Sequence, residues 1–277
     1  MKGSGLIIRV ITVAVVLPVV MFLAWVEPFR TGFSFFIGAF AAIGLYEYYA
    51  IVRARAISPE TIGGILAGTL VALSGHFNNL VATNLVLYGG CLLVFALHIV
   101  RGSHSVAGLA SSVFGVFYIG WFTAHILMLH ASARVGPGLV LLLFVAVFFT
   151  DVGAYFTGAM IGRHKLAPKV SPQKTWEGAV GGFALALAGV VALYALRRSH
   201  GWAALPDWPL GGYVYAGGLL SLTAQIGDLG ESCLKRDAGV KDSGIILPGH
   251  GGILDRCDGL LLAAPVLYYI VTPLCTN

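Results

Sequence analysis

The sequence predicts an all-α protein, a polytopic membrane helix bundle of about nine transmembrane helices. Of its 277 residues 58% are hydrophobic and only 10% are charged, whereas an average soluble domain is about 25% charged. The mean hydropathy is +0.87, so lipid is the expected solvent for most of the chain. Helices satisfy their own backbone hydrogen bonds in lipid, which makes a helix bundle the simplest architecture.

The apolar runs follow one another along the whole chain. A helix of about 20 residues crosses about 30 Å of hydrocarbon. Runs of roughly this length lie at 7–26, 32–51, 62–76, 80–100, 106–129, 138–161, 177–196, 211–230 and 252–275. The third run is short, and the eighth ends in polar residues. We expect one integral-membrane domain, 1–277, in which spans 1–135 carry no recognisable motif and spans 136–277 carry the chemistry.

The distribution of Lys and Arg predicts the orientation in the membrane. No small-x-small cleavage site follows the first run, so we interpret it as a retained span. With the N-terminus in the cytoplasm, thirteen of the 17 Lys and Arg residues face the cytoplasm, and the exceptions are Arg30, Arg134, Arg197 and Arg198. This bias follows the positive-inside rule. The net charge of +5 is largely explained by these cytoplasmic Lys and Arg residues, so we expect no nucleic-acid partner.

The four cysteines form no CxxC pair, so neither a disulfide framework nor a zinc site is predicted.

Acidic residues are rare and gather toward the predicted cytoplasmic side. Asp228 and Glu231 end the eighth run, and Asp255 and Asp258 begin the ninth. A spacing of three residues places the last two on one helix face, and paired carboxylates suit a divalent cation shared with substrate phosphates. The alternative is that a helix N-terminus simply favours acidic residues. For Asp151, inside the sixth run, a structural role and a functional role are equally favoured.

Donor groups surround these carboxylates. Asp228, Ser232 and Lys235 fall at i, i+4 and i+7, which is one helical stripe. Glycines surround His250 in the run Leu247–Gly252, so backbone N–H groups can approach an anion closely. An ordinary flexible turn is the equal alternative for this run.

A second polar segment, Arg163–Glu177, separates the sixth and seventh runs. Its Ser171, Lys174 and Thr175 can donate to a phosphate or a base just ahead of a helix N-terminus. The alternative is a basic anchor for anionic lipid beside the membrane.

Other polar residues in the spans receive a structural interpretation. Glu47 lies among tyrosines and is expected to pack inside the bundle. His98, His125 and His130 are expected to be satisfied core or interface histidines rather than ligands. Glycines four residues apart, in several spans, predict close helix packing.

Two segments of the C-terminal half have position-specific patterns. The longer reads Ser232-x-Leu234-Lys235-Arg236-x4-Lys241-Asp242-x-Gly244-x2-Leu247-Pro248-x-His250-Gly251-Gly252-Ile253-x-Asp255-Arg256-x-Asp258. The shorter reads Ser171-Pro172-x-Lys174-Thr175-x-Glu177-Gly178. The longer resembles the signature of the phosphatidate cytidylyltransferases, also called CDP-diacylglycerol synthases, and the shorter is similar to that family's upstream element. Cys257 departs from the pattern, because the family usually has a larger apolar residue or Thr there.

The resemblance implies an enzyme that joins CTP to phosphatidate in the bilayer, giving CDP-diacylglycerol and pyrophosphate. It implies a Mg²⁺-dependent site facing the cytoplasm, in a bacterial cytoplasmic membrane, with the identity of a second cation and homodimerisation left open. The implied metal ligands are Asp228, Asp255 and Asp258. The implied catalytic groups are Lys235, Arg236, His250, Asp255 and Asp258. The implied substrate-binding groups are Ser171, Lys174, Thr175, Ser232, Lys241 and Arg256.

Two other classes of protein remain as alternatives. A related lipid enzyme that uses CTP on an isoprenoid-ether phosphate, or that phosphorylates a polyprenol, would share the polar residues. Only substrate assays separate these enzymes. A transporter or ion channel with an acidic cation site is the second alternative, but it would scatter polar residues near the middle of the membrane. Here the polar residues gather at one face.

Overall fold

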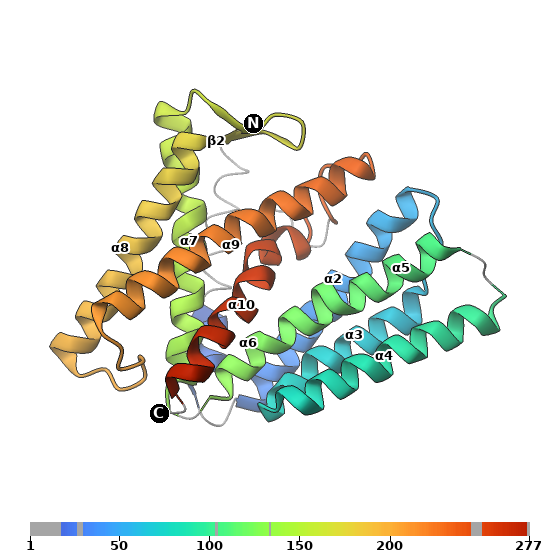
Figure 1. The fold of residues 1–277 in the computed structure, drawn as a ribbon, viewed down its shortest axis with the longest axis horizontal. Helices are drawn as coiled ribbons and strands as arrows, with labels where there is room; N and C mark the ends of the chain where they lie inside the picture. Colours follow the sequence, from blue (N-terminus) through green and yellow to red (C-terminus); the bar gives the residue numbers. More distant parts are fainter. Residues whose placement is uncertain (1–17, 27–29, 103–104, 133, 245–250, 276–277) are drawn as a thin grey trace. The chain divides into compact units, whose positions relative to one another are not determined.

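The chain is almost entirely helical, as predicted (Figure 1). A computed structural model describes residues 18–26, 30–102, 105–132, 134–244 and 251–275. The backbone forms two compact units. Unit 1 comprises Met1–Ala131 and Asp237–Cys257, and unit 2 comprises Ser132–Arg236 and Asp258–Asn277. That both units belong to one membrane domain stays a prediction.

Unit 1 holds the helices of the N-terminal half. They are α2 (Arg30–Ala54), α3 (Thr61–Ser74), the short η2 (Gly75–Phe77), α4 (Leu80–Val100), α5 (Val106–Gly115), the π-helical η3 (Val116–Trp121) and α6 (Phe122–His130). The last three run on as one apolar helix, Val106–His130, which confirms the helix expected over 106–129. Residues 18–25 are also helical, and the rest of the first predicted span lies outside the described residues.

Small residues let α3 approach its neighbours in unit 1. Gly64 lies against the ring of Tyr49, and Gly68 lies against Leu45. These are the close contacts expected of glycines four residues apart. The Tyr49 hydroxyl also donates a hydrogen bond of 2.8 Å to the Ser112 carbonyl, so a single side chain joins α2 to α5.

The three histidines expected to be structural are all hydrogen-bonded within unit 1. Nδ1 of His98 lies 3.3 Å from the Glu60 carboxylate. The His125 and His130 rings lie 2.8 and 2.9 Å from the carbonyl oxygens of Trp121 and Ala24. These contacts place all three in the packing of the helices.

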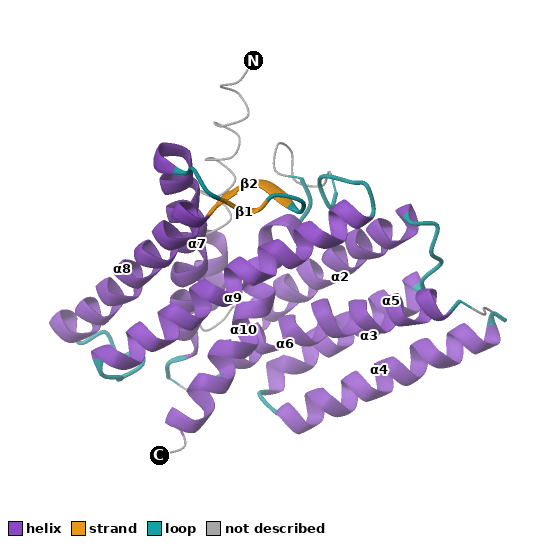
Figure 2. Cartoon of the chain, turned by 45° about the horizontal axis from the view of Figure 1, so that its top comes forward, coloured by secondary structure: helices purple, strands orange, loops and turns teal. Residues whose placement is uncertain are grey.

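Unit 2 holds the helices of the C-terminal half and a hairpin (Figure 2). Its elements are α7 (Gly136–Ile161), β1 (Lys165–Ala167), β2 (Ser171–Thr175), α8 (Trp176–His200), most of α9 (Leu210–Asp237) and all but the first turn of α10 (Leu254–Cys275). α9 continues well past its predicted end at residue 230. Ser232, Lys235 and Arg236 therefore extend the same helix that carries Asp228.

Glycines also set the packing of α7 on α8. A Cβ atom at Gly153 would lie 2.7 Å from the Gly181 carbonyl oxygen, and one at Gly178 would lie 2.8 Å from the Ala154 carbonyl oxygen. Neither position has room for a side chain. The backbones of α7 and α8 consequently run close together, and the hairpin connects the end of α7 to the start of α8.

The hairpin corrects the purely helical prediction. β1 and β2 pair antiparallel, with Lys165 opposite Thr175 and Ala167 opposite Ser171. Pro172 disfavours a helix here, and it is tolerated in a strand that has a free edge. Strands of three and five residues are too short to show a clear alternating pattern in the sequence. The predicted CTP-binding residues of this segment thus lie on a defined hairpin.

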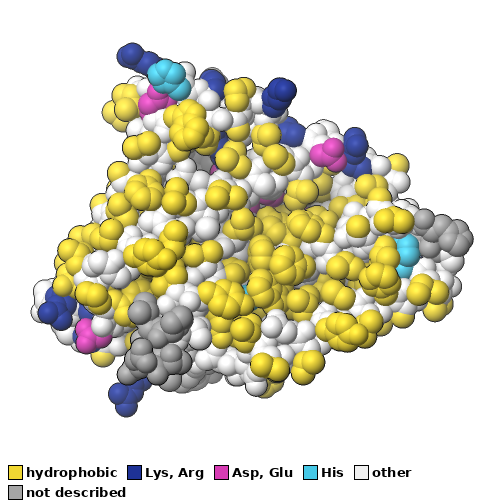
Figure 3. All heavy atoms as spheres, in the orientation of Figure 1, with side chains coloured by type: hydrophobic (Ala, Val, Ile, Leu, Met, Phe, Trp, Pro, Cys, Tyr) yellow, Lys and Arg dark blue, Asp and Glu magenta, His cyan; other side chains and the backbone are white. Residues whose placement is uncertain are grey.

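The protein is an integral membrane protein. Within the described ranges five helices are long and apolar enough to cross a membrane: Thr31–Ala54, Leu80–Val100, Val106–His130, Gly136–Ile161 and Trp176–His200. Large hydrophobic side chains are exposed on them, and hydrophobic atoms dominate the face in Figure 3. The apolar helix Thr61–Phe77 is shorter. The total of nine spans stays a prediction.

Candidate active site

Two glycines bring α9 and α10 together in unit 2. A Cβ atom at Gly227 would lie 2.5 Å from the Asp258 carbonyl oxygen, and one at Gly259 would lie 3.3 Å from Cβ of Ala224. Asp228 directly follows Gly227, so the close crossing brings the carboxylates of Asp228 and Asp258 within each other's electrostatic influence. The proximity that the sequence suggested for this pair is present in the structure.

Gly227→Ala should therefore separate the two helices and lower both activity and thermal stability. Overpacking of this kind typically costs about 1–3 kcal/mol. Gly230→Ala is the matched control on the same helix, since a Cβ atom there meets nothing within 4 Å. That substitution should leave the melting temperature in detergent unchanged or raise it slightly, because Ala favours helix. Equal melting temperatures for the two variants would contradict the close crossing.

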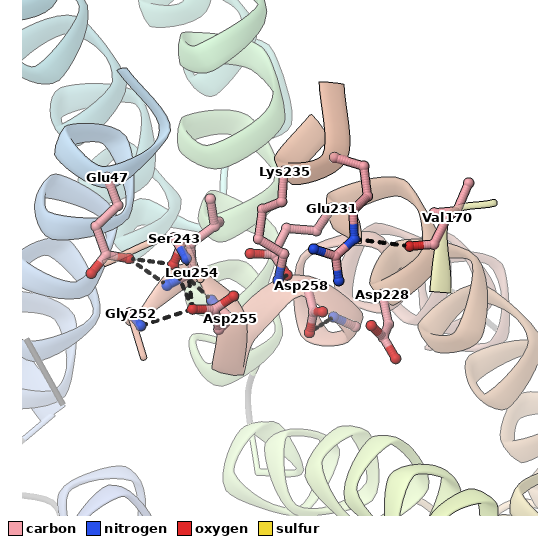
Figure 4. Close-up of polar contacts among 12 residues, drawn as sticks. Glu47, Val170, Asp228, Glu231, Lys235, Ser243, Gly252, Leu254, Asp255 and Asp258 are labelled. Atoms are coloured by element: carbon pink, nitrogen blue, oxygen red, sulfur yellow. Dashed lines mark hydrogen bonds and ion pairs between the residues drawn. The ribbon is translucent and has the colours of Figure 1, made fainter. Parts of the chain in front are cut away.

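Opposite charges alternate around this crossing. The Lys174 ammonium lies 2.5 Å from the Asp228 carboxylate, and the Lys235 ammonium lies 3.1 Å from the Glu231 carboxylate. Glu231 is fully buried, and its carboxyl group is within hydrogen-bond reach of the Asp258 side chain, a contact that needs one proton shared between the two acids. Figure 4 shows Glu231, Lys235 and Asp258 close to one another. Glu231, to which the sequence analysis gave no role beyond its place at the end of the eighth run, contacts both Lys235 and Asp258.

The pair Asp228 and Asp258 fits a magnesium ion by the chemistry of its donors. Among the described residues, no three His, Cys, Asp or Glu side chains gather as a complete metal site. Mg²⁺, however, is usually held by one or two carboxylates, with water and substrate phosphates completing its ligands. Two hard oxygen donors at one helix crossing meet that requirement. The Lys174 contact also shows that the Asp228 carboxylate accepts a cation.

Asp255 has partners of its own in unit 1. Its Oδ2 atom accepts hydrogen bonds from the backbone N–H of Ser243 and of Gly252, both at 2.8 Å, and lies 3.0 Å from the Ser243 hydroxyl. This oxygen therefore closes the turn that precedes α10. The sequence grouped Asp255 with Asp228 and Asp258 as metal ligands, and that role stays a prediction.

Glu47 of α2 is a residue of this region whose role the sequence analysis missed. It is only 1% exposed, as expected of a residue packed inside the bundle. Its carboxylate accepts hydrogen bonds of 3.0 and 2.9 Å from the N–H groups of Ile253 and Leu254 (Figure 4). The available signal was an acidic residue in an apolar span, which is costly unless it has a task. These N–H groups thus bind a carboxylate of the chain itself.

The hairpin is fixed to the N-terminus of α8. The Thr175 hydroxyl is buried and caps α8 by accepting from the Gly178 N–H at 3.1 Å. The Glu177 carboxylate accepts from the His164 N–H at 3.2 Å and lies 2.6 Å from the ring of that histidine. These contacts give the hairpin a defined place beside α8, while the predicted contact of Thr175 with CTP stays a prediction.

Arg236 joins the end of α9 to the turn of the hairpin. Its Nε–H donates a hydrogen bond of 3.2 Å to the Val170 carbonyl. The turn lies between the strands that carry Lys165 and Lys174. An arginine that the family resemblance implies is catalytic thus also holds the hairpin.

The other predicted site residues are distributed over both units. Unit 2 contains Ser171 and Ser232, both partly buried, and unit 1 contains Lys241 and Arg256, both exposed. His250 lies outside the described residues. Asp151 is exposed on α7. The structure thus brings together four of the predicted residues around one crossing, namely Lys174, Asp228, Lys235 and Asp258.

Comparison with known proteins points to one family. The profile described as Cytidylyltransferase family matches residues 7–274. A phosphatidate cytidylyltransferase of Brucella suis is 36% identical over 269 residues, which cover 96% of this chain and 93% of that protein. Proteins of the same name from Synechocystis sp. and Bacillus subtilis are 32% and 31% identical, and cover 86% and 92% of this chain and 88% and 94% of their own lengths.

Proposed function

This chain belongs to the cytidylyltransferase family, and on that premise we propose that it transfers CMP from CTP to phosphatidate. The products are CDP-diacylglycerol, which stays in the bilayer for phospholipid synthesis, and pyrophosphate. The observation that carries the proposal is the ion pair between Lys174 and Asp228. It joins the two polar segments, 54 positions apart in the sequence (228 minus 174), at the α9–α10 crossing where carboxylates and lysines alternate.

The reaction needs positioning and charge neutralisation more than proton transfer. A phosphate oxygen of phosphatidate attacks the α-phosphorus of CTP, and the bond to the pyrophosphate oxygen breaks. The second pKa of a phosphate monoester is about 6, so the nucleophile is ionised at neutral pH without a general base. CTP carries roughly four negative charges and phosphatidate roughly two. The protein therefore has to overcome their repulsion.

The cationic and hydroxyl groups of the site divide this task. Lys235, Arg236 and His250 contact the phosphates and stabilise charge during transfer. Ser171, Lys174 and Thr175 hold CTP, from the hairpin and the cap of α8. Ser232, Lys241 and Arg256 add contacts to the substrate phosphates.

The acidic residues of the site provide ligands for Mg²⁺. Asp228, Asp255 and Asp258 are the proposed ligands, and a second cation, Mg²⁺ or monovalent, belongs to the same proposal. When bound, the ion neutralises phosphoryl charge and helps to align the phosphates. In this proposal, Lys174 pairs with Asp228 when the site holds no substrate. When CTP binds, Lys174 contacts the phosphates of CTP instead.

The site opens to the cytoplasm in this proposal, because CTP arrives from water while the lipid presents its head group at the membrane surface. The asymmetry of Lys and Arg supports this orientation, because nine predicted spans with the N-terminus in the cytoplasm place thirteen of the 17 on the cytoplasmic side. The chain acts as one membrane domain in a bacterial cytoplasmic membrane. It needs no nucleic acid, and its assembly as a monomer or homodimer is left open.

Cysteine labelling of intact cells tests this orientation. In a variant without native cysteines, Val170→Cys should resist an impermeant maleimide added outside and react after the membrane is opened. Asp207→Cys, in the predicted outer loop 197–211, should react from outside and is the matched control. Labelling of position 170 from outside would reverse the orientation.

A panel of lipid acceptors tests the proposed substrate. Purified protein in detergent, with Mg²⁺ and CTP labelled at the α-phosphorus, should make lipid-soluble label from phosphatidate. An isoprenoid-ether phosphate should give at most a small fraction of that rate, and a polyprenol incubated with CTP labelled at the γ-phosphorus should take up no label. A faster reaction with the isoprenoid-ether phosphate would assign the chain to the related lipid enzyme.

A further inference from the structure

Glu47 is a buried carboxylate in a helix of the N-terminal half. It lies on α2 and is 1% exposed. A charged side chain in such a place is costly unless hydrogen bonds and opposite charge compensate it. Its compensation comes from a distant part of the chain, more than 190 positions later.

Among the described residues, the hydrogen-bond partners of Glu47 are Ser243, Ile253 and Leu254, which lie before or at the start of α10. Glu47 Oε1 accepts from the Ile253 N–H at 3.0 Å, and Oε2 accepts from the Leu254 N–H at 2.9 Å and from the Ser243 hydroxyl at 3.1 Å. The first N–H groups of a helix have no partners within the helix and carry the positive end of its dipole. The Glu47 carboxylate of α2 therefore caps the N-terminus of α10.

The same segment holds Asp255. The Ser243 hydroxyl lies within hydrogen-bond distance of both carboxylates, at 3.1 Å from Glu47 and 3.0 Å from Asp255. It also accepts from the Asp255 N–H at 3.3 Å. Because a hydroxyl has one proton, it donates to one carboxylate at a time. Glu47 and Asp255 are thus held in a fixed relation by one side chain and by neighbouring backbone groups.

The glycines of this segment are required by the same contact. A Cβ atom at Gly244 or Gly252 would collide with the Glu47 carboxylate. Gly251 has φ +82°, a conformation that favours glycine. Gly244 and Gly252 of the predicted motif therefore leave room for the Glu47 carboxylate. Gly251 supplies the backbone conformation needed just before α10.

We propose that Glu47 is a positioning residue for the reaction, which sets the start of α10 and thereby the orientation of Asp255. The inference rests on the proposed function, in which Asp255 is a ligand at the site, and it assigns a task to the N-terminal spans. Glu47 does not touch substrate in this proposal. Both of its oxygens are used by N–H and hydroxyl donors of the protein.

Glu47→Gln tests the proposal, because it keeps the shape and removes the charge. The amide offers one acceptor where the carboxylate offered two, so an N–H of α10 loses its partner. Groups that orient the ligands of a site typically contribute 10- to 100-fold to activity. We expect kcat to fall by about that range, the KM for CTP to change by less than about threefold, and half-maximal activity to need more Mg²⁺.

Glu60→Gln is the matched control, since Glu60 is another buried glutamate of unit 1 but pairs with His98 and Arg101. It should lower the melting temperature without changing kcat per folded molecule. Ser243→Ala is a milder second variant, which should lower kcat by about tenfold. It keeps the test informative if Glu47→Gln does not fold.

Amide hydrogen exchange of the metal-free protein supplies a readout that does not depend on activity. Peptides containing Ile253 and Leu254 should exchange at least about tenfold faster in Glu47→Gln than in the parent and in Glu60→Gln. Native exchange together with kcat within threefold of the parent would overturn the proposal, as would early melting with normal kcat. If the parent transfers no CMP, the positioning role falls with the proposed function, whereas faster exchange would still identify Glu47 as the anchor of α10.

Discussion

Asp258→Asn should abolish nearly all CMP transfer while the protein remains folded. The substitution keeps the shape of the side chain and removes a charge from the pair that fits Mg²⁺. Charge stabilisation by a metal is worth several kcal/mol, which corresponds to a loss of about 1000-fold or more. Folding should not suffer, because the variant relieves repulsion from the Asp228 carboxylate. Asp228→Asn should have a similar effect on activity.

Metal-dependent melting separates this account from a structural role. Mg²⁺ should raise the melting temperature of the parent protein by binding its folded state, and should protect Asp258→Asn much less. Asp207→Asn is the matched control, because its side chain is 70% exposed and lies in the predicted outer loop. It should behave as the parent in both assays. Early melting of Asp258→Asn with normal turnover of the folded fraction would remove Asp258 from the site.

Lys174→Met should have the second-largest effect, expressed mainly in the use of CTP. The substitution keeps an unbranched side chain and leaves Asp228 without the ammonium that lies 2.5 Å away. A hydrogen bond to a charged group contributes about 1.5–3 kcal/mol, so kcat/KM for CTP should fall about 10- to 150-fold. The KM for CTP should account for most of the loss, since Lys174 is assigned to substrate binding.

Lys169→Met is the matched control for this variant. Lys169 lies in the turn of the hairpin whose strand β2 carries Lys174, it is exposed, and its removal takes away the same formal charge. Steady-state kinetics at varied CTP should show near-parent values for this control. Equal losses in the two variants would mean that the hairpin acts only through its general positive charge.

The architecture was predictable because lipid restricts what a chain can do in it. A span needs internal hydrogen bonds and an apolar length, so runs such as 80–100 and 138–161 predicted α4 and α7 within two residues at each end. Charge ended the predicted run at residue 230, but the helix α9 continues to Asp237. Hydropathy marks where apolar sequence stops, which is not where the helix must stop.

That Asp228 and Asp258 lie near one helix crossing was also predictable, because the end of one apolar run and the start of the next lie at the same edge of the membrane. The partners of these residues were not. The Glu47–Leu254 contact joins positions 207 apart, and the Lys174–Asp228 pair depends on the hairpin. Such contacts arise from tertiary packing, which single-sequence periodicity does not encode. The glycines at 244 and 252 were visible as a motif, but their collision partner was not.

The most direct test of the central claim follows both products of one reaction. Purified protein receives phosphatidate, Mg²⁺ and CTP labelled at the α- or the γ-phosphorus in parallel tubes. The account predicts that the α label enters the lipid phase, and that one pyrophosphate carrying the γ label appears in water for each labelled lipid. Asp258→Asn should produce neither. Entry of the γ label into lipid, or product formation by Asp258→Asn at the parent rate, would contradict the account.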